Sequence, residues 1–112
     1  MSGKAFLFLK VFMFYLYILH SVTSDRYYVG YTNNPERRLR EHNNKEFTTY
    51  TSKHRPLVLM AVYECGEMEA DAIKIKRFIK KQKSRSLIEK LIQGCELVGI
   101  LAQLVRVPHV RY

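Results

Sequence analysis

Residues 27–43, YYVGYTNNPERRLREHN, constrain the fold of this chain more than any other segment. The stretch begins with the aromatic and β-branched residues that are typical of a strand, interrupted by Gly30. Asn34 is a favourable helix N-cap, and Pro35 suits the first position of a helix that we expect to end near Asn43. The segment therefore predicts a strand, a tight turn and a helix in direct succession.

The remaining elements follow from the hydrophobic patterns on either side of this segment. Residues 13–21 are expected to form a strand that pairs with residues 26–32 across a turn of about four residues. Residues 57–64 form a third, mostly buried strand, and helices are expected over 68–82 and 84–92. The order β-β-α-β-α-α predicts an α/β (α+β) domain, in which helices flank a small three-stranded antiparallel sheet.

The charge of the chain favours a polyanionic partner. Its 112 residues suffice for one domain and carry a formal net charge of +9. Between Lys74 and Lys90 there are eight Lys or Arg residues and a single acid, Glu89. We expect nucleic acid as the first class of partner and an anionic membrane as the second, with a merely solvated helical face as the alternative.

Two features bear on the compartment of the protein. Cys65 and Cys95 lie far apart and form no zinc or disulfide pattern, which predicts free thiols in a reducing, cytoplasmic compartment. Residues 5–19 are apolar apart from Lys10, but they are fewer than the ~20 residues that a membrane-spanning helix needs. A secretory signal on an exported basic peptide stays open as an alternative, since Lys4 supplies its charged end, although no small-residue cleavage site follows.

The strand–turn–helix segment also places three reactive side chains close together in sequence. Tyr28 can bind or deprotonate water, Arg38 can grip a phosphate with its guanidinium fork, and His42 can hold the tyrosine or relay a proton. Gly30 leaves room for a phosphate or the helix to approach the strand. Tyr17 lies on the expected partner strand. Each residue alone is more often packing or a solvated face, but together they favour phosphodiester chemistry.

The motifs LYIL at 16–19 and YVG at 28–30, followed by NPERRLREHN, resemble the GIY-YIG nuclease superfamily. The likeness is greatest to its small stand-alone bacterial members, the excinuclease-C-like or URI-domain endonucleases, and covers roughly residues 12–92. Leu16 and Tyr15 stand in place of the family's Gly-Ile pair. The catalytic residues that the resemblance implies are Tyr17, Tyr28, Arg38 and His42.

The resemblance further implies a DNA endonuclease that hydrolyses phosphodiester bonds. Mg²⁺ or Mn²⁺ is the implied cofactor, and neither a small-molecule cofactor nor a membrane partner is expected. Branched or damaged DNA, as met in DNA repair, is the candidate substrate. The side chains expected to contact the nucleic acid are Arg37, Lys76, Lys80, Lys81, Lys83 and Arg85.

One position departs from the family pattern. The family's helix carries a metal-binding glutamate in a pattern like A-x-x-x-E-x-x-I-K, and Lys76 occupies that position here. Mg²⁺ takes oxygen ligands, which an ammonium cannot supply, so the metal ligands are unknown. Glu64, Glu67 and Glu69 are the next candidates, although Glu69 lies two helical turns from Lys76, about 10 Å along the axis. The alternative function is a non-catalytic basic nucleic-acid-binding module on the same fold.

The two ends of the chain stand apart from the predicted domain. Residues 1–11 are an N-terminal extension to the domain at 12–92, and residues 93–112 form a tail without clear periodicity. Written back into ordinary codons, residues 101–109 resemble the 5′ half of a tRNA gene. We hypothesise that the reading frame runs into a neighbouring tRNA gene and that the tail is unselected. The genomic sequence after the codon for Ile92 tests this hypothesis.

Overall fold

The computed structural model describes residues 12–44 and 52–108, and in them four strands form one antiparallel sheet. The strands are β1 (Phe14–Ser21), β2 (Tyr27–Thr32), β3 (Leu57–Gly66) and the two-residue β4 (Val105–Arg106). Their order across the sheet is β2-β1-β3-β4. The helical elements are α2 (Pro35–Asn43), α3 (Glu69–Gln82), α4 (Arg85–Gln93) and two short 3-10 helices, η1 (Ser52–His54) and η2 (Gly99–Gln103).

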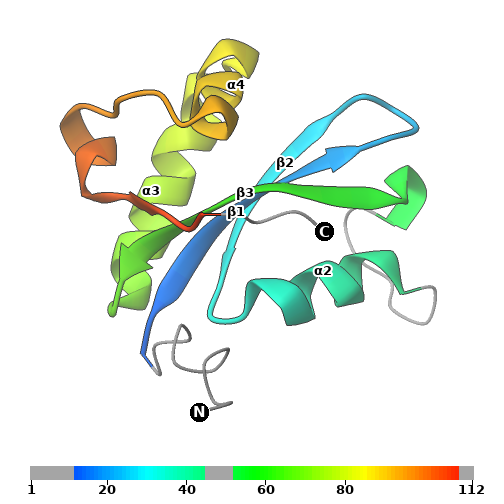
Figure 1. Cartoon of the computed structure of the whole chain (residues 1–112), viewed down its shortest axis with the longest axis horizontal. Helices are drawn as coiled ribbons and strands as arrows, with labels where there is room; N and C mark the ends of the chain where they lie inside the picture. The colour runs from blue at the N-terminus through cyan, green and yellow to red at the C-terminus, as the bar shows by residue number, and fades with distance from the viewer. Residues whose placement is uncertain (1–11, 45–51, 109–112) are drawn as a thin grey trace.

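Helices lie on both faces of the sheet, α3 and α4 on one face and α2 on the other (Figure 1). Side chains of a strand alternate between the two faces, so the central strand β1 contributes to two cores. Leu16 and Ile18 pack with α3 and α4, whereas Tyr17 and Leu19 lie in the core on the side of Leu39 in α2. Burial on both faces explains why the β1 sequence is almost continuously apolar.

The predicted fold class and the order of the main elements are confirmed, but the predicted number of strands is wrong. The tail returns to the outer edge of β3, where Tyr63 pairs with Arg106 and Glu64 pairs with Val105. This strand consists of only two residues at the edge of the sheet. A segment so short shows no alternation of polar and apolar residues, so the sequence did not predict it. The α/β (α+β) domain therefore has a four-stranded sheet.

Residues 93–108 pack against the domain, although the sequence indicated no element there. Leu101 and Leu104 are buried in the core beneath α3 and α4. The Arg106 guanidinium donates hydrogen bonds to the carbonyls of Leu91 and Ile92 at the end of α4, at 2.9 and 3.0 Å. The hypothesis about a tRNA gene concerns the genome and stays a prediction.

Two expectations fall wholly or partly outside the described residues. The extension at 1–11 lies outside them, as do residues 109–112 of the expected tail. Within the part of the chain that the structure describes, we find no helix with the length and apolar character needed to cross a membrane.

Candidate nucleic-acid and catalytic site

Tyr17 lies across the neighbouring strand because Gly30 has no side chain. The two residues are partners in the pairing of β1 with β2. A Cβ atom on Gly30 would lie 2.4 Å from the hydroxyl oxygen of Tyr17 and 2.5 Å from its Cζ. Real Cβ atoms essentially never show contacts this short, so any larger residue at position 30 would force the Tyr17 ring to move. The space that the sequence assigned to a phosphate or to the helix is filled by the Tyr17 ring.

The Tyr17 hydroxyl lies 3.1 Å from Nε2 of His42, which joins β1 to α2. Both side chains are buried, with 6% of Tyr17 and 5% of His42 exposed. Burial, reinforced by the charge of Arg38, lowers the pKa of His42 to about 4. His42 is therefore neutral at neutral pH, and its Nε2 shares one hydrogen bond with the Tyr17 hydroxyl, in which the imidazole tautomer decides the donor. Burial likewise raises the pKa of Tyr17, which keeps this hydroxyl protonated.

The start of α2 places Arg38 beside this pair. The Asn34 side chain accepts a hydrogen bond from the backbone N–H of Arg37 at 3.1 Å, and Pro35 opens the helix, as predicted. One turn later Arg38 is 36% exposed, and its Nη1 donates to Oε1 of Glu41 at 2.9 Å. The Arg38 guanidinium also lowers the pKa of Tyr17, but burial raises this pKa by more.

Tyr28 lies on β2, opposite Leu19 of β1. Its ring packs near the ring of His54, with the centroids 5.8 Å apart. The hydroxyl oxygen of Tyr28 is buried in this conformation, although the residue as a whole is only half-buried. Water activation by Tyr28 stays a prediction.

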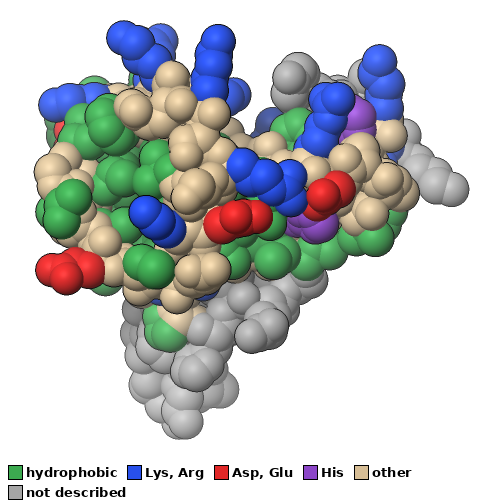
Figure 2. Space-filling view, turned by 90° about the horizontal axis from the view of Figure 1, so that it is seen from above, with side chains coloured by type: hydrophobic (Ala, Val, Ile, Leu, Met, Phe, Trp, Pro, Cys, Tyr) green, Lys and Arg blue, Asp and Glu red, His purple; other side chains and the backbone are tan. Residues whose placement is uncertain are grey.

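A cleft of about 690 Å³ brings most of the predicted site residues together, and we call it the cationic cleft. The predicted residues that line it are Tyr17, Tyr28, Arg38, His42, Lys76, Lys80, Lys83 and Arg85. Arg26, which was not among the predicted residues, lines it as well. Its position directly before the YYVG strand was the signal that could have indicated it. Arg37 and Lys81 are not among its lining residues. Lys and Arg side chains project along one edge of the molecule (Figure 2).

Besides Arg38, two of the predicted phosphate-binding cations that line the cleft already have partners. Arg85 donates to the backbone carbonyl and the Oδ1 of Asp25, at 3.0 and 2.9 Å, and so ties α4 to the turn between β1 and β2. It also lies 3.2 Å from Glu89, and its charge is thereby largely compensated. The Lys76 ammonium lies 5.3 Å from the centroid of the Tyr31 ring, where it makes a cation–π contact.

The donor set of the cleft does not fit a divalent metal. Its one carboxylate, Asp25, is bound by Arg85 and by His20, whose Nε2 lies 2.8 Å from Asp25 Oδ1. Across residues 12–44 and 52–108, no three His, Cys, Asp or Glu side chains converge on a common point. Mg²⁺ and Mn²⁺ prefer several oxygen ligands, whereas Lys76 contributes a positive charge to the same cleft.

Comparison with known proteins places these elements in a family. The model of a protein family described as the GIY-YIG catalytic domain matches residues 13–90. A UPF0213 protein of Bacillus licheniformis is 34% identical over 86 residues, covering 73% of this chain and 87% of that protein. A UPF0213 protein of Haloquadratum walsbyi is 34% identical over 79 residues, covering 68% and 86% respectively. The chain therefore belongs to the GIY-YIG nuclease superfamily, as its motifs predicted.

Proposed function

We propose that this protein is a DNA endonuclease-type domain that binds the DNA backbone along the cationic cleft and hydrolyses a phosphodiester bond there. One observation carries the proposal. The buried Tyr17–His42 pair and Arg38 border the same cleft as three lysines, two from α3 and one at its C-cap. Six Lys or Arg side chains line this cleft against one carboxylate, and such a surface attracts and holds phosphates.

The roles of the side chains follow from their exposure. Arg38 is half-exposed and can turn from Glu41 to a phosphate, where its fork would offset charge that develops on the reacting oxygens. Tyr17 and His42 are buried and act behind it as a rigid support that fixes the floor of the cleft. Tyr28 is the candidate for orienting water, a role that requires its hydroxyl to become accessible.

A divalent metal is part of the chemistry that the proposed hydrolysis would use. GIY-YIG nucleases are generally metal-dependent, and Mg²⁺ or Mn²⁺ would supply Lewis-acid stabilisation of the transition state. The described residues of this cleft offer no matching set of oxygen ligands. Metal-dependent cleavage by this chain would have to draw ligands from the DNA phosphates or from residues outside the cleft.

Lys76 supports a second candidate function, a nucleic-acid-binding module that does not cleave. Its ammonium lines the cleft at the position where the family pattern has a metal-binding glutamate. A fixed positive charge there attracts a phosphate and repels a divalent cation, so binding would improve while hydrolysis is lost.

One pair of assays tests both candidates. Cleavage of plasmid and branched DNA is measured with Mg²⁺, with Mn²⁺ and with EDTA, and binding to the same DNA is measured in EDTA over a salt series. Metal-dependent cleavage supports the nuclease, whereas tight binding without cleavage in any metal supports the binding module.

The cationic cleft itself is tested by a matched pair of substitutions. We expect Lys80→Ala to weaken binding and to reduce its salt dependence by about one counterion, because Lys80 lines the cleft. Lys90→Ala, on the exposed part of α4 away from the lining residues, should leave binding nearly unchanged. Binding that does not depend on salt, or equal effects of both substitutions, would contradict the assignment of the cleft.

A further inference from the structure

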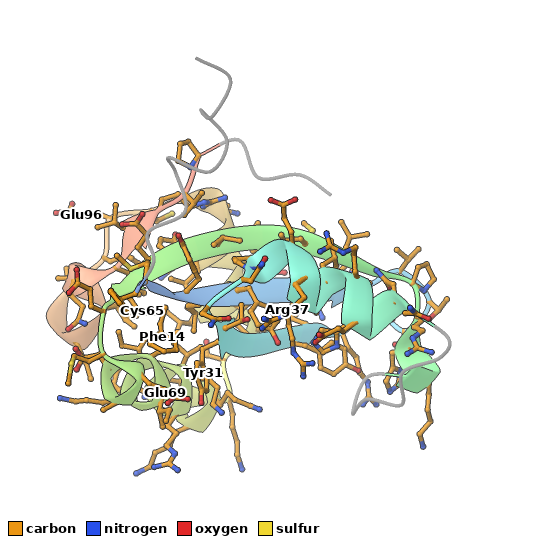
Figure 3. All side chains as sticks on the ribbon, turned by 90° about the horizontal axis from the view of Figure 1, so that it is seen from below. Phe14, Tyr31, Arg37, Cys65, Glu69 and Glu96 are labelled. Carbon is orange, nitrogen blue, oxygen red and sulfur yellow. The ribbon has the colours of Figure 1, made fainter. Side chains whose placement is uncertain are left out.

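A second hollow of about 420 Å³ adjoins the cationic cleft, and Arg38 lines both. We call it the aromatic hollow. The residues that characterise it are Phe14, Tyr31, Arg37, Arg38, Glu41 and Glu69. Phe14, Tyr31 and Glu69 gather near the start of α3, and Arg37 projects from α2 (Figure 3). The site residues of the proposed nuclease explain the cationic cleft, but they leave this second hollow without a role.

The two hollows differ in charge and in chemical character. The aromatic hollow has two arginines and two glutamates, so its lining is neutral overall and does not favour a phosphate. Its rings are partly exposed, with the centroids of Phe14 and Tyr31 6.4 Å apart. The Tyr31 hydroxyl donates to Oε2 of Glu69 at 2.8 Å, which holds the ring in place. The aromatic faces suit a flat, uncharged group that can stack on them. The hydrogen-bond donors and carboxylate acceptors beside them suit a group whose edge carries both N–H and C=O groups. A nucleobase has both properties.

Lys76 connects this hollow to the phosphate site. It lines the cationic cleft, and its ammonium lies over the Tyr31 ring at the border of the aromatic hollow. The ammonium ends a flexible four-carbon stem, so it can turn to a phosphate and release the ring face. A phosphate bound by Lys76 and Arg38 would then have its own base within reach of Tyr31.

Building on the proposed binding of DNA, we propose that the aromatic hollow holds an unpaired base of a strand whose backbone lies in the cationic cleft. A base inside a duplex is paired and stacked, and it cannot reach the Tyr31 ring without being taken out of the helix. The preferred substrate class is therefore single-stranded DNA, or DNA with an unpaired segment, rather than intact duplex.

The test compares two substitutions of Tyr31 on single-stranded and duplex DNA of the same sequence. Tyr31→Leu removes the ring, and we expect about a tenfold loss of affinity for the single strand, the range that a base–aromatic stack contributes, with little change for the duplex. Tyr31→Phe is the matched control, because it keeps the ring and removes only the hydroxyl that binds Glu69. It should restore most of the single-strand affinity that Tyr31→Leu loses, because the ring that stacks on the base is still present. Circular dichroism establishes that both variants are folded.

Each outcome has a defined meaning. If the unmodified protein binds no DNA of either kind, the proposed function fails and this inference fails with it. If DNA binds but Tyr31→Leu leaves single-strand affinity unchanged, only the stacking role is overturned. Equal losses for single strand and duplex would also overturn it, because they would mean that Tyr31 acts on the phosphate site through Lys76.

Photocrosslinking of the unmodified protein provides a test that needs no variant. A single strand containing 5-iodouracil at successive positions is irradiated with the protein, and the adducts are located by mass spectrometry. We expect crosslinks to Tyr31 or Phe14. Crosslinks only to residues of the cationic cleft, in a protein that binds the strand, would overturn the base site.

Discussion

The buried His42 makes the stability of this domain depend on pH in a way that can be isolated. Burial, with the charge of Arg38, lowers the pKa of His42 from an ordinary 6.5 to about 4 in the folded protein. Between these values the unfolded chain binds a proton that the folded protein does not. Stability is therefore complete above the ordinary pKa and falls as the pH drops from about 6.5 toward 4.

The magnitude follows from the two pKa values. When the pKa of a group differs by one between the folded and the unfolded protein, the difference corresponds to about 1.4 kcal/mol of stability. Integrating the difference in bound protons between the unfolded and the folded protein from pH 7.5 to pH 5 gives a loss of about 2 kcal/mol in the free energy of unfolding from His42 alone. Other carboxylates and histidines also titrate in this range, so the total pH dependence does not identify His42. The difference in pH dependence between the unmodified protein and a variant without this imidazole does identify the contribution of His42.

Urea unfolding at pH 7.5 and pH 5 measures the effect in three proteins. His42→Gln keeps an oxygen that can accept from Tyr17 but cannot titrate, so its pH-dependent loss should be about 2 kcal/mol smaller than that of the unmodified protein. Tyr17→Phe is the control, because it removes the hydrogen bond and leaves the imidazole buried. It should keep the full pH dependence. Equal pH dependence in His42→Gln and the unmodified protein would refute the reasoning.

Four further substitutions test other parts of the site and fold. Gly30→Ala would push its Cβ against Tyr17 and should cost about 1–3 kcal/mol of unfolding free energy in urea, and a neutral result would show that the ring is not confined. Arg38→Ala should change stability by less than about 1 kcal/mol while raising the barrier of any cleavage by about 3 kcal/mol, so unaltered cleavage would remove it from the site. Lys76→Glu should weaken DNA binding and introduce Mg²⁺-dependent cleavage, and a folded variant without cleavage would favour the binding module. Leu104→Ala should cost about 2 kcal/mol in urea unfolding, and no loss would show that the tail is not packed.

The sequence predicted those parts of the fold that depend on local patterns. Asn34 and Pro35 mark the start of α2 because capping is a property of neighbouring backbone groups, and the structure has that cap. A helix was likewise expected over 84–92, and in the structure the Ser84 side chain caps α4 by accepting from the N–H of Leu87. The β1–β2 hairpin and the buried strand β3 followed from aliphatic and aromatic runs that tertiary packing did not override.

Features that depend on distant contacts were not predictable from pattern alone. The tail returns to β3 through two residues and through Arg106 at the end of α4, and no periodicity precedes such a contact. Gly30 was identified as a place of close approach, but only the strand register reveals that Tyr17 is the approaching group. Arg85 belonged to a basic run in sequence, yet in space it faces Asp25. All three contacts form only because the fold brings together elements that are distant in the sequence, which no local pattern indicates.

The residues of the site differ in how strongly their presence indicates a function. Tyr17 and His42 are buried, fill the space beside Gly30 and form their own hydrogen bond, so packing alone would account for both. Arg38 is different, because a half-exposed cation in a surface ion pair adds little stability and could be replaced at small cost. The cluster of cations around the cationic cleft costs stability through mutual repulsion, a cost that binding a polyanion removes. The exposed cations, rather than the buried pair, are therefore the stronger support for the proposal that this cleft binds nucleic acid.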